Sequence, residues 1–126
     1  MPSITILVED SNRIREVLVP SMEELGNMKV VAIAETVDEA TAALDLHGAE
    51  WRVAVVDLFL REGSGLDVLR ACRHRLPHQR VVILTNYATA EIRSRCLGMG
   101  ADAVFDKSTE LDDFFDLCAT YDIPAR

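Results

Sequence analysis

Four apolar runs in this sequence end in an acid, a hydroxyl or an ammonium group. Glu9 and Asp10 close the first run and Asp57 closes the second, while Thr85 and Lys107 close the third and fourth. The carboxyl ends of parallel strands lie along one edge of a sheet, where open α/β sheets bind their ligands. We therefore expect these five side chains to converge in one polar site.

The three acids form a group of oxygen donors suited to a hard cation. Mg²⁺ usually takes one or two carboxylates together with water and phosphate oxygens. Asp57 follows four apolar residues typical of a strand buried on both faces, where an ionised carboxylate is costly without partners. Without a cation, Glu9, Asp10 and Asp57 would also repel one another. The spacing therefore predicts a Mg²⁺ site.

The rest of the chain alternates short apolar runs with segments of helical periodicity. Such alternation predicts a parallel sheet with helices on both faces. Strands are expected at residues 4–8, 30–34, 53–56, 80–85 and 103–106, and the helices between them are expected to end near Gly26, His47, Arg75 and Leu97, with a last helix after residue 109.

Local signals predict how the helices begin and end. Asp10 or Ser11 is expected to cap the first helix, and Ser108 or Thr109 the last. Thr36 and Glu39 have the spacing of a capping box. Pro20 lies inside the first helix, where it removes an amide donor, so a kink or a break is expected there.

Composition limits the possible classes of protein. A chain of 126 residues with 49% hydrophobic content predicts one domain, residues 1–126. No apolar run approaches the roughly 20 residues that cross a bilayer, so a cytoplasmic protein with no membrane contact is expected. Three widely spaced cysteines favour reduced thiols. The formal charge of −8 argues against direct binding of nucleic acid.

Four segments in this order and spacing resemble the receiver domain of two-component response regulators: ILVEDSNR, VVDLFL followed by GSG, LTNYA and VFDKS. The resemblance covers essentially the whole chain. It implies an α/β, flavodoxin-like fold, which is a doubly wound, five-stranded parallel sheet of strand order 2-1-3-4-5 with five helices.

The resemblance also implies a role for each site residue. Asp57 matches the phosphoacceptor, which becomes an acyl phosphate. The Mg²⁺ ligands would be Glu9, Asp10, Asp57 and the backbone carbonyl of Phe59. Lys107 would hold phosphoryl oxygens, and Thr85 matches the hydroxyl that turns inward once the phosphoryl group is present.

The implied partners are proteins. A histidine kinase or a histidine phosphotransfer protein would supply the phosphoryl group, and a downstream protein target would read the change in the last two helices. A homodimer through these helices is a further expectation. Because the chain ends soon after the last expected helix, we expect a stand-alone receiver that is a switch, with possible autodephosphorylation, rather than a turnover enzyme.

Some positions depart from the family pattern. Phe59 and Tyr87 lie two residues after Asp57 and Thr85, where they would line access to the acyl phosphate and slow its hydrolysis; surface packing is the alternative. The aromatic switch position holds Val104, with Phe105 on the opposite face of the strand, so Tyr87 is the expected substitute.

A further departure lies after the lysine. Ser108 follows Lys107 where the family usually has proline, so a trans peptide bond or a strained loop is expected. Two other functions stay open. One is a degenerate receiver acting as a scaffold without phosphorylation. The other is an aspartate-nucleophile phosphatase, whose general acid would stand at the position of Phe59.

Overall fold

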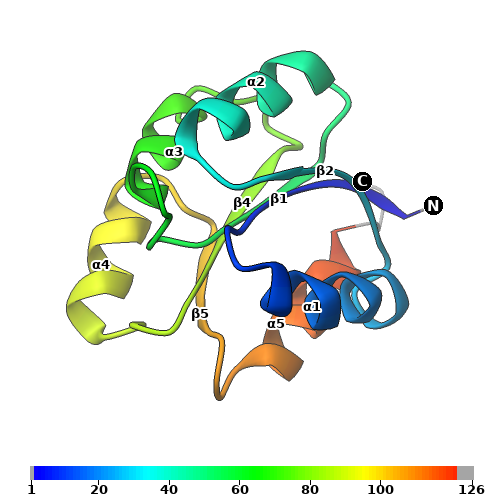
Figure 1. Cartoon of the computed structure of the whole chain (residues 1–126), viewed down its shortest axis with the longest axis vertical. Helices are drawn as coiled ribbons and strands as arrows, with labels where there is room; N and C mark the ends of the chain where they lie inside the picture. Colours follow the sequence, from blue (N-terminus) through cyan, green and yellow to red (C-terminus); the bar gives the residue numbers. More distant parts are fainter. Residues whose placement is uncertain (1, 122–126) are drawn as a thin grey trace.

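The computed structural model describes residues 2–121, so Met1 and residues 122–126 of the predicted domain lie outside the described part. Five strands and five helices alternate along the chain (Figure 1). In chain order they are β1 (Ser3–Val8), α1 (Asn12–Leu25), β2 (Met28–Ala34), α2 (Val37–His47), β3 (Val53–Val56), α3 (Gly65–Ala71), β4 (Arg80–Thr85), α4 (Ala90–Gly98), β5 (Ala103–Asp106) and α5 (Leu111–Thr120).

The strands form a single parallel sheet in the order β2-β1-β3-β4-β5, which confirms the predicted topology. Its register aligns the strand ends that carry polar residues. Val8 pairs with Val56, and the Asp57 amide donates to the Val8 carbonyl at 2.9 Å. Likewise the Lys107 amide donates to the Thr85 carbonyl at 3.0 Å. The acids of β1 and β3 and the polar ends of β4 and β5 therefore meet at one edge.

Helices cover both faces of the sheet (Figure 1). On one face α1 and α5 pack through side chains such as Met22 and Phe114. On the other, α2, α3 and α4 contribute residues such as Leu44, Leu69 and Cys96. All four residues of β3 are buried because helices cover both of their faces. All three cysteines are free and buried, as expected for packing residues.

Hydroxyl caps begin two of the helices as predicted. Ser11 Oγ accepts from the Ile14 amide at 3.3 Å. Thr36 Oγ1 accepts from the Glu39 amide at 3.1 Å, whereas the Glu39 carboxylate accepts from the amide of Glu35, one residue before the cap. The capping box is therefore present with its second bond shifted by one residue. Within residues 2–121, no helix is long and apolar enough to cross a bilayer.

Three local predictions are wrong in whole or in part. Helix α1 runs through Pro20 without a break, because the carbonyl that loses its donor is that of exposed Glu16, where water can bind it; the kink expected there stays a prediction. Helix α3 stops at Ala71, well before Arg75. Neither Ser108 nor Thr109 caps α5, because Asp106 Oδ1 accepts from the amides of both residues and holds them in a turn.

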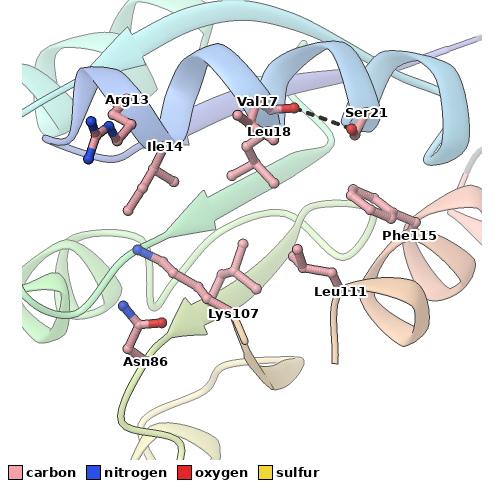
Figure 2. A pocket seen from close by; sticks show the side chains of 10 residues that line it. Arg13, Ile14, Val17, Leu18, Ser21, Asn86, Lys107, Leu111 and Phe115 are labelled. Atoms are coloured by element: carbon pink, nitrogen blue, oxygen red, sulfur yellow. Dashed lines mark hydrogen bonds between the residues drawn. The ribbon is translucent and has the colours of Figure 1, made fainter. Parts of the chain in front are cut away.

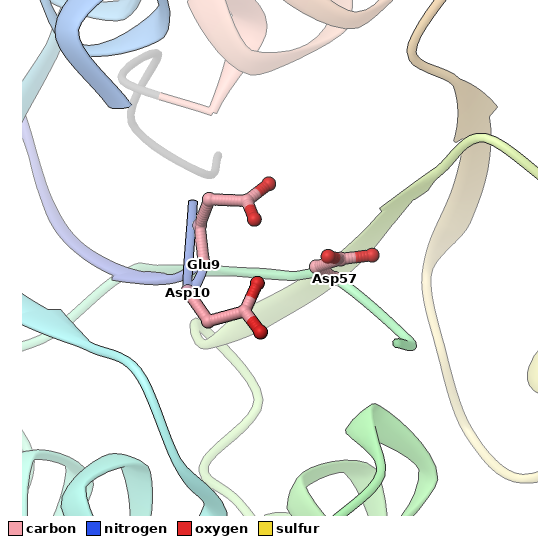
Figure 3. A group of neighbouring side chains, drawn as sticks. All are labelled: Glu9, Asp10 and Asp57. Carbon is pink, nitrogen blue, oxygen red and sulfur yellow. The ribbon is translucent and has the colours of Figure 1, made fainter. Parts of the chain in front are cut away.

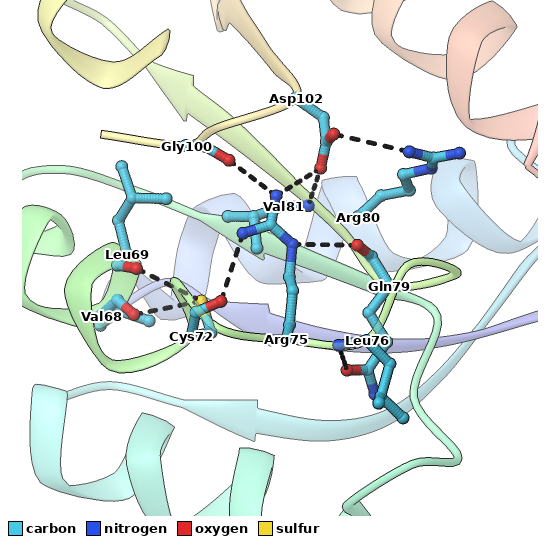
Figure 4. A network of polar contacts seen from close by, with 10 residues as sticks. All are labelled: Val68, Leu69, Cys72, Arg75, Leu76, Gln79, Arg80, Val81, Gly100 and Asp102. Atoms are coloured by element: carbon cyan, nitrogen blue, oxygen red, sulfur yellow. Dashed lines mark hydrogen bonds and ion pairs between the residues drawn. The ribbon is translucent and has the colours of Figure 1, made fainter. Parts of the chain in front are cut away.

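Arg75 lies in the turn that follows α3, and its side chain crosses to the amino ends of β4 and β5 (Figure 4). Its guanidinium donates to the carbonyls of Gln79, Cys72 and Gly100 at 2.9, 3.2 and 2.6 Å. It also pairs with Asp102 at 2.8 Å, and Asp102 accepts from the Val81 amide at 2.8 Å. This Arg75–Asp102 network joins the turn after α3 to the loop before β5.

Candidate functional site

Three carboxylates lie together where β1 and β3 end (Figure 3). Glu9, Asp10 and Asp57 each offer one oxygen, and these oxygens lie within 4.8 Å of one another. Two ligands of one Mg²⁺ ion stand about 4 Å apart at most, since each bond is about 2.1 Å long. The three carboxylates therefore fit a Mg²⁺ ion after small side-chain movements.

Lys107 brings a positive charge into this group from the end of β5. Its Nζ lies 2.5 Å from Glu9 Oε1 and 3.2 Å from Asp57 Oδ2, and its side chain is 9% exposed. These contacts join the ends of β1, β3 and β5, and the strand order places the end of β4, with Thr85, between those of β3 and β5. The cluster holds three carboxylates and one ammonium, so it keeps an excess of negative charge that suits a divalent cation.

The Glu9 carboxylate has hydrogen-bond and ion-pair partners within residues 2–121. Its second oxygen accepts from the Ser11 amide at 3.2 Å, so both of its oxygens already have partners. By contrast, the Asp10 side chain makes no hydrogen bond or ion pair with residues 2–121. Glutamate is one methylene longer than aspartate, and this length carries the Glu9 carboxylate to Lys107, so Asp10 and Asp57 are the acids more available to a cation.

Burial disfavours the ionised form of the Asp57 carboxyl. Removal from water raises the pKa of its carboxyl, Lys107 opposes that shift and Glu9 adds to it, and the net result is a pKa of about 6. Asp57 Oδ1 also accepts from the Phe59 amide at 3.3 Å. Because only the ionised carboxylate is a nucleophile, a cation bound beside Asp57 would favour the reactive form.

Thr85 and the two aromatic residues connect the loops that follow β3 and β4. The fully buried Thr85 hydroxyl accepts from the Tyr87 amide at 3.2 Å. The rings of Phe59 and Tyr87 meet edge to face with centroids 4.9 Å apart. Phe59 is 54% exposed and Tyr87 is 61% exposed. The two rings would touch both if they line the path of water to the acyl phosphate and if they only pack on the surface. The role in limiting access of water therefore stays a prediction.

The positions that depart from the family pattern lie as expected. Val104 packs with the helices on one face of the sheet, whereas the Phe105 ring lies on the other face, 6.0 Å from the ring of Phe114. Phe105 therefore points away from the face that holds Val104. The Lys107–Ser108 bond is trans, since residues 2–121 contain no cis peptide bond.

Arg15 supports the acidic pair, and the sequence reasoning missed it. From the first turn of α1, its guanidinium donates to the Glu9 carbonyl at 2.7 Å and pairs with Glu35 at 2.9 Å. The arginine thereby holds the backbone of the acidic pair close to α1. The sequence offered one signal for this role: Arg15 lies four residues after the cap Ser11, on the first turn of the helix that follows Glu9 and Asp10.

A groove of about 320 Å³ runs between α1 and α5 and ends at the candidate site (Figure 2). Apolar side chains such as Ile14, Leu18 and Phe115 line it, and Asn86 and Lys107 stand at one end. Val17, on its rim, is 71% exposed. An apolar surface therefore leads directly to the ammonium group beside Asp57.

Comparison with known proteins identifies the fold and the family. Residues 5–119 match the response regulator receiver domain. The REC domain of AraT, a response regulator from Geobacillus stearothermophilus, superposes with a TM-score of 0.77 at 26% identity, covering 96% of this chain and 93% of that one. The CheX-CheY-BeF3-Mg²⁺ complex from Borrelia burgdorferi has a TM-score of 0.77 at 16% identity, covering 93% and 90%.

Curated relatives include the photosynthetic apparatus regulatory protein RegA of Rhodobacter capsulatus, 34% identical over 86% of this chain and 56% of its own. The acid tolerance regulatory protein ActR of Rhizobium meliloti is 33% identical over 86% of this chain and 54% of its own. The chain thus spans about half the length of these relatives. With the fold, the acidic cluster and the match over residues 5–119 together, this chain belongs to the response regulator receiver domain family.

Proposed function

We propose that this receiver domain is a phosphorylation-dependent switch in which Asp57 takes a phosphoryl group from a phosphohistidine of a partner protein. A carboxylate oxygen of Asp57 attacks phosphorus, and the bond between phosphorus and the imidazole nitrogen breaks. The nitrogen keeps the electron pair, and Asp57 becomes an acyl phosphate. The observation that carries the proposal is the convergence of Asp57 with Glu9, Asp10 and Lys107 at one buried edge.

Asp10, Asp57 and the Phe59 carbonyl would hold Mg²⁺, with Glu9 contributing directly or through water. When bound, Mg²⁺ supplies positive charge that offsets the phosphoryl oxygens. Lys107 has the reach to pass from Asp57 to those oxygens, since its Nζ already lies 3.2 Å from the carboxylate. Thr85 donates its hydroxyl to the phosphoryl group and gives up the Tyr87 amide.

The groove between α1 and α5 is the proposed contact surface for the phosphohistidine partner, a histidine kinase or a histidine phosphotransfer protein. A protein that brings an imidazole to Asp57 must cover the surface around Lys107, and there the groove offers apolar side chains that include the exposed Val17. Partner contact would therefore bury apolar area next to the reacting atoms.

The downstream part of the proposal concerns the last two helices. Phosphorylation would alter α4, α5 and the surface between them, and a protein target would read that change. A homodimer through these helices stays a prediction. So does a stand-alone receiver in the cytoplasm, because the curated relatives are about twice as long as the matched region. The proposed phosphorylation of Asp57 is the same whether a second domain of this protein or a separate protein responds to it.

Two alternatives predict different chemistry. A scaffold without phosphorylation would have no use for an ammonium 3.2 Å from Asp57 or for a buried hydroxyl, that of Thr85, at the end of β4. An aspartate-nucleophile phosphatase needs a general acid two residues after the nucleophile, where Phe59 stands, and a phenyl ring cannot donate a proton. A switch that is phosphorylated once and is not a turnover enzyme is therefore the proposal.

The test is the intact mass of the protein after incubation with Mg²⁺ and acetyl phosphate. We expect a gain of one phosphoryl group in the wild type and none in Asp57→Asn. Asp102→Asn, in the cluster at the other end of the sheet, is the matched control and should gain the group. No gain in any variant, with Mg²⁺ binding also absent, would leave the scaffold, whereas steady turnover of a phosphomonoester would favour the phosphatase.

A further inference from the structure

Arg93 joins three segments around the position where the family pattern has an aromatic switch. From α4, its Nε donates to the Ala88 carbonyl at 2.9 Å and its Nη1 to the Val104 carbonyl at 3.1 Å. Its Nη2 pairs with the Glu110 carboxylate. One guanidinium thus connects the loop after β4, the strand β5 and the residue that precedes α5.

Glu110 extends this connection into the backbone between β5 and α5. The oxygen that accepts from Arg93 also accepts from the Asp106 amide at 3.0 Å. Arg93 and Glu110 are 34% and 28% exposed, so water only partly screens the pair. A planar guanidinium holds several acceptors in fixed directions, so movement of one acceptor disturbs the others.

Ala88, the residue of the loop after β4 that accepts from Arg93, lies close in the chain to Thr85, whose hydroxyl is the predicted switch group. Ala88 directly follows Tyr87, whose amide donates to Thr85 Oγ1 at 3.2 Å. If the Thr85 hydroxyl turned toward a phosphoryl group, Tyr87 would lose this bond, and the backbone of the loop after β4 would lose one of its anchors. A shift of the loop would carry the Ala88 carbonyl, which accepts from Arg93 Nε.

We infer that Arg93 is the positioning residue through which phosphorylation of Asp57 alters the start of α5, in place of the ring that Val104 lacks. The inference rests on the proposed function and names how that site is coupled to the last two helices. The sequence of contacts runs from Thr85 through Tyr87 and Ala88 to Arg93, and from there to Glu110 and Asp106.

Amide hydrogen exchange, with and without Mg²⁺ and beryllofluoride, tests this coupling. Beryllofluoride mimics the phosphoryl group, and the Asp106 amide reports the Glu110 bond directly. In the wild type, we expect the ions to speed exchange at Asp106 about fivefold, as the loss of one hydrogen bond implies. In Arg93→Ala, the ions should still bind, within about twofold of the wild-type affinity, but exchange at Asp106 should no longer respond to them.

Two further variants control for simple damage to the fold. Arg95→Ala lies on the same helix, and the Arg95 side chain makes no hydrogen bond or ion pair with the described residues, so it should respond like the wild type. Glu110→Ala removes the acceptor of the Asp106 amide itself, so exchange at Asp106 should be fast both with and without the ions, which gives the rate of the fully broken bond for comparison.

The possible outcomes separate the coupling from the proposed function. If the wild type does not bind beryllofluoride with Mg²⁺, the proposed function fails and the coupling fails with it. If the wild type binds the ions but Asp106 does not respond, or if Arg93→Ala responds as the wild type does, the coupling alone is overturned. Loss of the response in Arg93→Ala, with binding kept and with Arg95→Ala responding as the wild type does, supports it.

Discussion

The two ends of the parallel sheet each hold a cluster of charged side chains, and the clusters differ in how well their charges are matched. At the amino ends of β4 and β5, one carboxylate, Asp102, pairs with Arg75 at 2.8 Å and with Arg80 at 3.7 Å. At the carboxyl ends, three carboxylates lie together, and the ammonium of Lys107 pairs with two of them, Glu9 and Asp57. In the first cluster the carboxylate has cationic partners close by, whereas the second carries an excess of negative charge that a bound cation would offset.

This difference shows how one kind of interaction serves two purposes. A carboxylate with matched partners stabilises the fold and has no need of a ligand. Crowded carboxylates with one cation cost folding energy, and binding of metal and phosphoryl groups can recover that energy. We therefore expect the same kind of substitution to act in opposite directions at the two ends.

The largest effect is expected from Arg75→Met. The change removes three bonds to backbone carbonyls and leaves Asp102 with the more distant Arg80, so the free energy of unfolding should fall by about 3 kcal/mol. Urea denaturation measures the fall. Arg73→Met is the control, because its exposed side chain makes no hydrogen bond or ion pair among residues 2–121. Equal stability of the two variants would contradict a structural role for the network.

Asp57→Asn should raise stability at pH 7.5 in the absence of Mg²⁺. A carboxyl whose pKa rises on folding, here from 3.8 to about 6, favours the folded state only while it is protonated, so this contribution is lost as the pH rises through 6. Removing the charge should therefore add roughly 1–3 kcal/mol at pH 7.5 and progressively less toward pH 4.

Asp102→Asn provides the matched comparison for this substitution. Because the Asp102 carboxylate pairs with Arg75, its loss should lower stability by about 1–2 kcal/mol at the same pH. Urea denaturation across the pH range measures both variants. Opposite signs of the two stability changes would support the difference between the charge clusters at the two ends of the sheet. Loss of stability in Asp57→Asn would contradict it.

Mg²⁺ should stabilise the wild type and leave Asp57→Asn almost unchanged. At ten times its Kd, the ion should add about 1.4 kcal/mol to the free energy of unfolding. Asp10→Asn should weaken Mg²⁺ binding more than Glu9→Gln does, because both Glu9 oxygens already have partners. Calorimetric titration measures the affinities, with the exposed Asp45→Asn as control. A stronger effect of Glu9→Gln would show that Glu9 turns from Lys107 to the metal.

The smallest effect is expected at the aromatic pair. Phe59→Ala should speed hydrolysis of the acyl phosphate about threefold, because loss of the ring contact with Tyr87 opens a path for water. Loss of the phosphoryl mass over time measures the rate, and Leu46→Ala, also on an exposed apolar residue, is the control. An unchanged rate would favour the packing alternative.

Patterns along the chain were enough to predict the sheet and the edge that carries the site. Apolar runs alternate with helical periodicity, and parallel strands must return to the same edge, so polar residues after each run converge. Thr36 and Glu39 also predicted a helix start, because a cap depends on neighbouring residues alone. The break at Pro20 was mispredicted, because the cost of the lost hydrogen bond depends on whether water reaches the freed carbonyl.

Only the tertiary structure decided which long side chains meet. Lys107 and Glu9 are 98 residues apart, and their contact depends on the order of β1, β3, β4 and β5. The partners of Arg75 and Arg93 lie on other segments as well. A flexible arginine or lysine has many rotamers and no sequence period that marks its partner. The sequence by itself therefore determined where the site lies, and folding decided how its charges are paired.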